Sequence, residues 1–202
     1  MTQQSTFTDT DRKHLLNAIC EAKHGYIEYG MGESTSMLIA NRPELPSCSV
    51  ESDRDFLMAW RDAQPESYKQ SNHVAVHAFI GPTKGWGYPA NDRFRHLWPA
   101  YCMLPFAISE QACNADVVFV DGRFRVACAL NALLSITRNF TLLVHDFNRI
   151  EYYVLLKYFE YEQATDFRNG DSLVVLRPKH NWSWQDVRAD FAKLIGNMQP
   201  AC

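Results

Sequence analysis

Short apolar runs alternate with helix-like segments through most of the 202-residue chain. A run that is apolar throughout is typical of a strand buried on both faces, as in parallel sheets that are covered by helices. The expected elements are strand 26–29, helix 34–41, strand 47–51, helix 53–63, strand 73–80, strand 116–120, helix 123–136, strand 140–144 and helix 149–159. The sequence therefore predicts an α/β fold with one doubly wound, Rossmann-like and mostly parallel sheet of about seven strands.

The beginning of the chain departs from this alternation. Residues 8–24 have the apolar spacing of a leading amphipathic helix, and Thr8, Asp9 or Thr10 is expected to cap it. The length of the chain suits one domain over residues 1–202.

The end of the pattern also differs. Residues 161–167 and 172–176 are predicted to be two strands joined by a tight turn at Asn169-Gly170, so the sheet is expected to close with an antiparallel hairpin. The longest irregular stretch, 81–113, is rich in Gly, Pro and aromatic residues, which favours a functional loop or an inserted helix over the crevice.

Composition limits the class of partner. A formal charge of -3 gives no support to a polyanion-binding surface, so no nucleic-acid partner is expected. No uncharged run approaches the ~20 apolar residues that span a bilayer, and no basic segment precedes an apolar one, so we expect no membrane segment and a cytoplasmic protein. The six cysteines form no C-x-x-C pair and are expected to be mostly buried free thiols. The sequence leaves the oligomeric state open, a homo-oligomer included.

The segment Glu28-Tyr29-Gly30-Met31-Gly32-Glu33-Ser34 follows the first expected strand. In a doubly wound sheet the ligand crevice lies at this end of the strands. Glycines there permit positive φ and a close approach of ligand to backbone, and the next helix presents free N–H groups to a negative group. A plain tight turn from strand to helix is the alternative.

Two acids suggest which ligand binds. Glu28 suits a cationic amine better than a phosphate, and Glu51, 21 residues after Gly30, is placed to accept hydrogen bonds from both hydroxyls of a ribose. An amine, a carboxylate and a ribose together describe S-adenosylmethionine.

From residue 26 to residue 176 the chain resembles the class I S-adenosylmethionine-dependent methyltransferases, whose first motif is E/D-x-G-x-G-x-G. Ser34 stands in place of the third glycine, where serine can begin the helix. Nicotinamide-dependent dehydrogenases, the nearest rival, would have glycine or alanine where this chain has Thr35. The resemblance implies S-adenosylmethionine as cofactor and these cofactor-binding residues: Glu28, Gly30, Gly32, Ser34, Thr35 and Glu51.

A second constellation follows the fourth and fifth expected strands of the parallel sheet. Asp121-Gly122 and His145-Asp146 both lie at carboxyl ends of strands, so they are expected to face the same crevice. They resemble a small-molecule methyltransferase subgroup with D-G-x-H-x-Y after one strand and H-D or D-D after the next. Phe124 stands where that subgroup often has histidine, so no role of that histidine is carried over.

The roles of these residues stay open between alternatives. Asp121 is a general base, a metal ligand with Asp146, or the cap of the helix that follows. A divalent metal is not favoured, because Phe147 replaces the asparagine that cation-dependent relatives have. The ordinary pKa of a histidine side chain would suit His145 to act as a base at neutral pH. The alternative is a histidine that is only hydrogen-bonded at a strand end.

The 81–113 segment supplies candidate acceptor-binding residues. Its flat apolar surface and positive charge suit an aromatic or anionic small molecule. The alternative is that the segment is an internally packed loop with solvated charges. Of Arg123 and Arg125, at most one is expected to point into the site, because residues two apart do not share a helix face. The candidates are Trp86, Tyr88, Arg93, Arg95 and Arg123.

The expected function is methylation of an oxygen or nitrogen of a small-molecule acceptor by direct displacement. The alternative is a protein that binds S-adenosylmethionine or S-adenosylhomocysteine without turnover, and Phe124 and Phe147 keep that alternative open. A dehydrogenase dependent on NAD is a third candidate.

Overall fold

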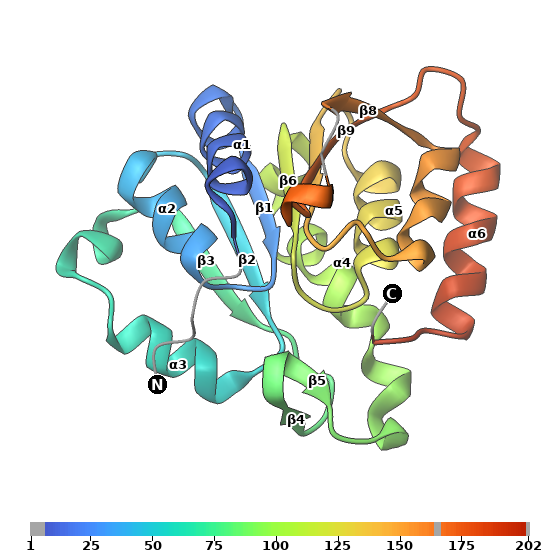
Figure 1. Ribbon diagram of the computed structural model, residues 1–202. Helices are drawn as coiled ribbons and strands as arrows, with labels where there is room; N and C mark the ends of the chain where they lie inside the picture. Colours follow the sequence, from blue (N-terminus) through green and yellow to red (C-terminus); the bar gives the residue numbers. More distant parts are fainter. Residues whose placement is uncertain (1–6, 164–166, 201–202) are drawn as a thin grey trace.

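A computed structural model describes residues 7–163 and 167–200, and Figure 1 shows its course. A seven-stranded sheet has the order β3-β2-β1-β6-β7-β9-β8. Its first five strands in this order are parallel, whereas β9 runs antiparallel to both β7 and β8. This order confirms the doubly wound sheet with a C-terminal antiparallel hairpin. The strands are β1 (Tyr26–Tyr29), β2 (Ser47–Glu51), β3 (His73–His77), β6 (Val117–Val120), β7 (Thr141–Val144), β8 (Phe159–Gln163) and β9 (Val174–Pro178).

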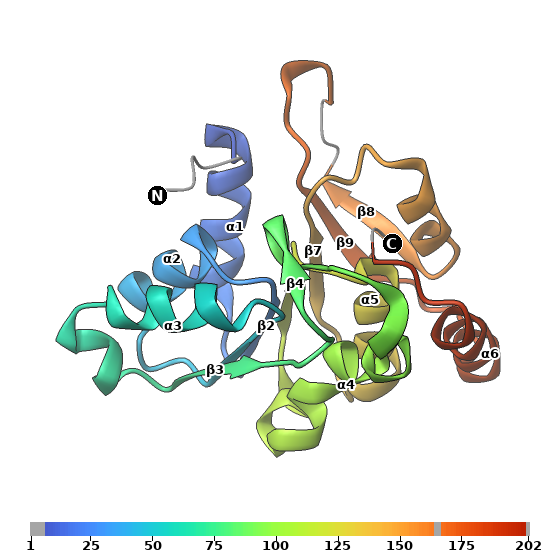
Figure 2. The ribbon, with the colours of Figure 1, turned by 90° about the horizontal axis from the view of Figure 1, so that it is seen from below.

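Helices cover both faces of the sheet. Figure 2 shows α1, α2 and α3 on one side and α4, α5 and α6 on the other. Within β6 the side chains alternate, so that Val117 and Phe119 join one buried apolar cluster while Val118 and Val120 join the other. The helices are α1 (Asp9–Glu21), α2 (Glu33–Asn41), α3 (Arg54–Asp62), α4 (Pro99–Ile108), α5 (Arg125–Ser135) and α6 (Trp184–Gly196).

Thr8, one of the three expected candidates, is the N-cap residue of α1. Its side chain accepts the N–H of Asp11, and the Asp11 side chain accepts the N–H of Thr8. The Thr8 hydroxyl also donates to Asp171 (2.7 Å), which ties the start of α1 to the segment before β9.

The predicted tight turn at Asn169-Gly170 is wrong. The two strands of the hairpin are separated by residues 164–173, of which 164–166 lie outside the described residues. Strand β9 begins later than expected because the N–H groups of Ser172 and Leu173 donate to Oδ1 of Asp11 (3.2 and 2.9 Å) instead of a neighbouring strand. Side chains distant in sequence therefore set this boundary.

The predicted helix 149–159 is also wrong in type and extent. The chain forms a 3₁₀ helix, Ile150–Lys157, and Phe159 already begins β8. Helix α6, after the hairpin, is an element that the sequence pattern did not indicate.

The 81–113 segment contains an inserted helix, which was one of its two expected forms. A two-stranded hairpin of β4 (Thr83–Lys84) and β5 (Tyr88–Pro89) comes first, and α4 then packs on the sheet. Further short 3₁₀ helices are Glu66–Gln70, Gly85–Gly87, Asp92–Leu97, Glu110–Asn114 and Phe167–Asn169.

The described cysteines are all free thiols. Cys48, Cys102 and Cys128 are buried, as expected, but Cys20 is exposed. Across residues 7–163 and 167–200, no helix is both long and apolar enough to cross a bilayer.

Candidate functional site

A cavity of about 610 Å³ opens at the carboxyl ends of β1, β2, β6 and β7. This volume lies within the range of small-molecule sites. The position is the one expected for a doubly wound sheet, where the loops after neighbouring strands meet. The lining residues are Phe7, Gly30, Met31, Gly32, Glu33, Ser34, Glu51, Ser52, Asp53, Phe56, Gly85, Trp86, Gly87, Tyr88, Tyr101, Asp121, Gly122, Arg123, Arg125, His145, Asp146 and Arg149.

The two glycines of the β1–α2 turn meet different surroundings. Gly30 has φ +89°, and a Cβ there would lie 2.6 Å from both Cα and N of Gly122. A Cβ on Gly32 would have no heavy atom within 4 Å. Gly30 therefore allows two backbone segments to approach each other, whereas Gly32 leaves the wall of the cavity bare.

A hydrogen-bond chain holds this turn from behind. The N–H of Gly32 donates to Oγ1 of Thr35 (3.0 Å), which donates to Oε2 of Glu28 (2.6 Å). The Ser49 hydroxyl donates to the same oxygen (2.5 Å). Glu28 and Thr35 are fully buried behind the turn and are not part of the cavity wall. Glu28 thus orders the turn from below.

Burial has a strong effect on the Glu28 carboxyl. It raises the pKa to about 7, although hydrogen bonds from Ser34, Ser49 and Thr35 oppose the rise. Proton uptake by Glu28 near neutral pH is therefore coupled to the packing of the turn.

Glu51, the last residue of β2, lies on the cavity wall in a fixed orientation. Its Oε1 accepts the N–H groups of Ser52 (2.6 Å) and Asp53 (2.8 Å), and its Oε2 accepts the N–H of Met31 (3.1 Å). Burial raises the pKa of Glu51 against these hydrogen bonds. The Met31 contact joins the loop after β2 to the glycine turn, so Glu51 and Gly32 share one wall.

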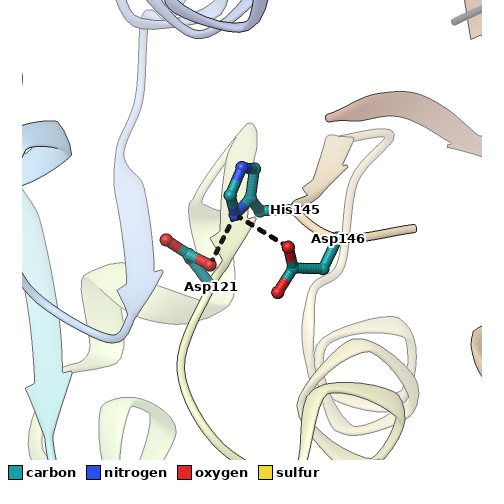
Figure 3. A group of neighbouring side chains, drawn as sticks. All are labelled: Asp121, His145 and Asp146. Atoms are coloured by element: carbon teal, nitrogen blue, oxygen red, sulfur yellow. Dashed lines mark hydrogen bonds and ion pairs between the residues drawn. The ribbon is translucent and has the colours of Figure 1, made fainter. Parts of the chain in front are cut away.

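Asp121, His145 and Asp146 form a second group of polar side chains in the cavity (Figure 3). Nδ1 of His145 lies 2.9 Å from Oδ1 of Asp121 and 3.7 Å from Oδ1 of Asp146. Burial lowers the pKa of His145, but the hydrogen bond that its ring donates to Asp121 and the charges of both carboxylates outweigh this effect and raise the pKa overall. The other ring nitrogen, Nε2, is buried without a hydrogen-bond partner among the described residues.

Arg125 neutralises the two carboxylates. Its Nη2 lies 3.1 Å from Oδ1 of Asp121 and 3.1 Å from Oδ2 of Asp146, and its Nη1 donates to the carbonyl of His145. The guanidinium is 3% exposed. The contacts of Asp121 do not favour its expected role as the cap of the next helix. The N-cap residue of α5 is Phe124, and no side chain forms a capping hydrogen bond there.

The same three side chains are candidate ligands of a divalent ion. One possible ligand atom from each of Asp121, His145 and Asp146 lies within 4.8 Å of the others. A metal ion bound by them would lie beside the buried guanidinium of Arg125, which already supplies a positive charge to both carboxylates. The donor set therefore suits an arginine-neutralised cluster better than a metal centre.

Both Arg123 and Arg125 face the cavity, which corrects the expectation that at most one does. The helix rule does not apply, because α5 begins at Arg125 and Phe124 before it has the left-handed φ of 55°. Arg123 lies in the preceding turn, with its Cζ 3.9 Å from the centre of the Tyr88 ring.

The expected acceptor-binding residues divide into two groups. Trp86, Tyr88 and Arg123 line the cavity, whereas Arg93 and Arg95 do not. Arg95 donates instead to Oδ1 of Asn197 (2.8 Å) and the carbonyl of Met198 (3.0 Å), and holds the segment after α6. Arg93 is exposed.

Several residues that line the cavity were not predicted from the sequence. Phe7 lies before the first helix, yet its ring packs edge-on against His145 with centroids 4.8 Å apart. Arg149 pairs with Oδ2 of Asp146 (2.7 Å) from a segment expected to be an ordinary helix. Tyr101 comes from α4. Only Arg149 carried a signal, because it lies three residues after Asp146 next to a predicted site.

Comparisons with known proteins agree with this architecture. A methyltransferase-like protein (spo2022) from Silicibacter pomeroyi DSS-3 is 30% identical, with a TM-score of 0.76 over 95% of this chain and 96% of that chain. Cofactor-bound Rv0187 from MTB is 16% identical, with a TM-score of 0.59 over 88% and 83% of the two chains. Methanococcus jannaschii fibrillarin, a pre-rRNA processing protein, is 12% identical, with a TM-score of 0.52 over 85% and 76%. No family model and no curated protein matches the sequence.

The last two likenesses concern the fold, which is that of the class I methyltransferases. The first is close enough in sequence and complete enough in both chains to show kinship. The chain belongs to the same family as the Silicibacter pomeroyi protein, a family of methyltransferase-like proteins.

Proposed function

We propose that this protein is an S-adenosylmethionine-dependent methyltransferase that methylates an oxygen or nitrogen of a small-molecule acceptor. The observation that carries the proposal is the wall on which Glu51 and the bare backbone of Gly32 lie together. A carboxylate held by three backbone N–H groups keeps lone pairs in a fixed direction for the two hydroxyls of a ribose.

The amino-acid part of the cofactor is assigned to the start of α2. Gly32 leaves space at the first turn of the helix, and Ser34 lines the cavity beside it. N–H groups at a helix start favour a carboxylate there. Glu28 and Thr35 act by holding this turn, so their part in cofactor binding is to position Gly32.

His145 and Asp121 are the proposed catalytic pair. The bound cofactor supplies an electrophilic methyl group, which the acceptor oxygen or nitrogen attacks. Asp121 holds His145 through Nδ1 and leaves Nε2 to take the acceptor proton. Asp146 and Arg125 fix the charge around this pair. Alignment of the two reactants is expected to supply most of the rate gain, up to roughly 7 to 11 kcal/mol in favourable models.

Binding without turnover is the second candidate, and Phe7 favours it. The Phe7 ring packs against His145, and Nε2 of His145 has no access to solvent or a described partner. An acceptor reaches Nε2 only if this contact opens. A protein in which it stays closed binds the cofactor and does not use it.

A small acceptor is proposed over RNA, although the fold is shared with a pre-rRNA processing protein. A cavity of about 610 Å³ suits the cofactor and a small reacting molecule. A formal charge of -3 does not suit a long polyanion.

The experiment is to incubate the protein with S-adenosylmethionine and measure S-adenosylhomocysteine in three samples: a small-molecule extract, an RNA extract, and buffer. Product in the small-molecule sample alone is expected. Product with RNA alone contradicts the acceptor class, and tight cofactor binding with no product in any sample favours the binding protein.

A further inference from the structure

Arg123 is a buried cation on the cavity wall that lacks an acidic partner. The residue is 6% exposed, and its Nε has no hydrogen-bond partner among the described residues. Within the part of the chain that the structure describes, no carboxylate lies within ion-pair distance of its guanidinium. A buried charge without a counter-charge is costly, so a group from outside the chain is expected to complete it.

The charged groups around Arg123 also include more cations than anions. Asp121 and Asp146 are shared by Arg125 and Arg149, so three guanidinium groups, with Arg123, face two carboxylates around this end of the cavity. Among the described residues, neither carboxylate forms an ion pair with Arg123. One further anionic group balances the set.

Arg123 contacts Tyr88 of the β4–β5 hairpin. Phe124 adopts φ 55° at the start of α5, so Arg123 lies in the turn before the helix. Its guanidinium stacks on the Tyr88 ring at 3.9 Å, which fixes the plane of its N–H donors. Burial raises the pKa of Tyr88, but the charges and hydrogen bonds of Arg123 and Arg149 outweigh it and lower the pKa overall. The same positive environment acts on any group that enters.

We infer that the acceptor carries an oxyanion, a carboxylate or a phosphate, that binds Arg123 beside Tyr88 and Arg149. This inference rests on the proposed function, because it names the chemical class of the molecule methylated at the same site. A planar guanidinium pairs with such a group through two N–H donors, and the nearby His145 then faces the nucleophile of the same small molecule.

The test is calorimetric titration of the protein, saturated with S-adenosylhomocysteine, with benzoate, inorganic phosphate and neutral benzamide. Saturable binding of benzoate or phosphate, but not benzamide, is expected, and the tighter of the two identifies the oxyanion. Arg123→Gln should weaken that binding by about tenfold or more, because hydrogen bonds between charged groups are lost. Arg138→Gln, a change at an exposed arginine outside the cavity, should leave it unchanged.

Affinity for S-adenosylhomocysteine separates the two proposals. Arg123→Gln should change it by no more than about twofold, because the acceptor and not the cofactor is assigned to this arginine. An equal loss of cofactor affinity overturns the inference and assigns Arg123 to the cofactor carboxylate. Equal binding of benzamide, or unchanged benzoate and phosphate binding in Arg123→Gln, also overturns it. The titrations are repeated without S-adenosylhomocysteine, so that oxyanion binding is measured even if the wild type binds no cofactor. An absence of cofactor binding counts against the proposed function alone.

Discussion

Nδ1 of His145 lies 2.9 Å from Oδ1 of Asp121, and the two residues come from the ends of neighbouring parallel strands. The pairing fixes which ring nitrogen is engaged and leaves Nε2 as the one available for proton transfer. The rest of the cluster keeps this pair in place through Arg125, which contacts both residues.

The first prediction concerns the titration of His145. Asp121 raises the pKa of His145, so Asp121→Asn should lower it, and the pH at which His145 loses its proton should move down. Heteronuclear NMR of the imidazole resonances, assigned with His145→Gln, measures the shift without any need for an acceptor. Once an acceptor is known, His145→Ala should reduce turnover by about 10²- to 10⁴-fold with cofactor affinity nearly unchanged. An unchanged histidine titration in Asp121→Asn, or full turnover in His145→Ala, would remove the pair from the chemistry.

The second prediction compares two glycines in one turn. Gly32→Ala should leave the unfolding free energy within about 1 kcal/mol of wild type, because φ 166° is extended backbone and the added methyl meets no protein atom. The methyl projects into the cavity, so affinity for S-adenosylhomocysteine should fall. Gly30→Ala should cost about 2 to 4 kcal/mol, because φ is +89° and Cβ would overlap Gly122. Denaturant unfolding and calorimetric titration of both variants measure these effects, and a Gly32→Ala protein with normal cofactor affinity would contradict the assigned wall.

The third prediction concerns stability against pH. The folded-state pKa of Glu28 is raised to about 7 from an ordinary value near 4.5, so its contribution to stability is present below pH 4.5 and is lost as pH rises through 7. Glu28→Gln cannot ionise. Relative to this variant, wild type should lose about 3 kcal/mol of unfolding free energy between pH 4.5 and pH 7.5.

Urea unfolding at several pH values gives that difference. Glu66→Gln is the matched control, because Glu66 is exposed and forms an ion pair with the exposed Lys69. If wild type and Glu28→Gln have parallel stability profiles, the buried carboxyl is not the titrating group.

The sequence predicted the doubly wound sheet and the place of the cavity, because alternating apolar runs and a glycine turn indicate both. Apolar runs and the glycine turn are short-range features, and the carboxyl ends of β1, β2, β6 and β7 follow from the sheet. The acids Glu51 and Asp121 were found in this way, and both lie on the cavity wall.

The remaining features depend on contacts that no local pattern encodes. Phe7 reaches His145 only because the start of α1 is tied to the segment before β9 through Thr8 and Asp171. The charge of Arg125 is divided between two loops. The spacing rule wrongly left Arg125 out of the site beside Arg123, because α5 starts one residue after a left-handed Phe124. Glu28 was assigned to the ligand, yet its oxygen accepts hydrogen bonds from Thr35 behind the turn, an alternative that becomes visible only when the side chains are packed.

The fourth prediction concerns divalent metal. Arg125 already neutralises Asp121 and Asp146, so dialysis against EDTA should change neither the melting temperature nor turnover, and added Mg²⁺ should not raise either. Arg125→Met leaves the two carboxylates without this charge and should lower the melting temperature, which Mg²⁺ should partly restore. A wild-type protein that needs Mg²⁺ for turnover would contradict the arginine-neutralised cluster.

The most direct test of the central claim is a calorimetric titration of the wild-type protein with S-adenosylhomocysteine and with NAD, repeated for Glu51→Gln. We expect saturable binding of S-adenosylhomocysteine with one site per chain, no binding of NAD, and a loss of about tenfold or more in Glu51→Gln, since a carboxylate on the cavity wall is assigned to the ribose hydroxyls. Binding of NAD in place of S-adenosylhomocysteine, or an unchanged affinity in Glu51→Gln, would contradict the assignment of this cavity.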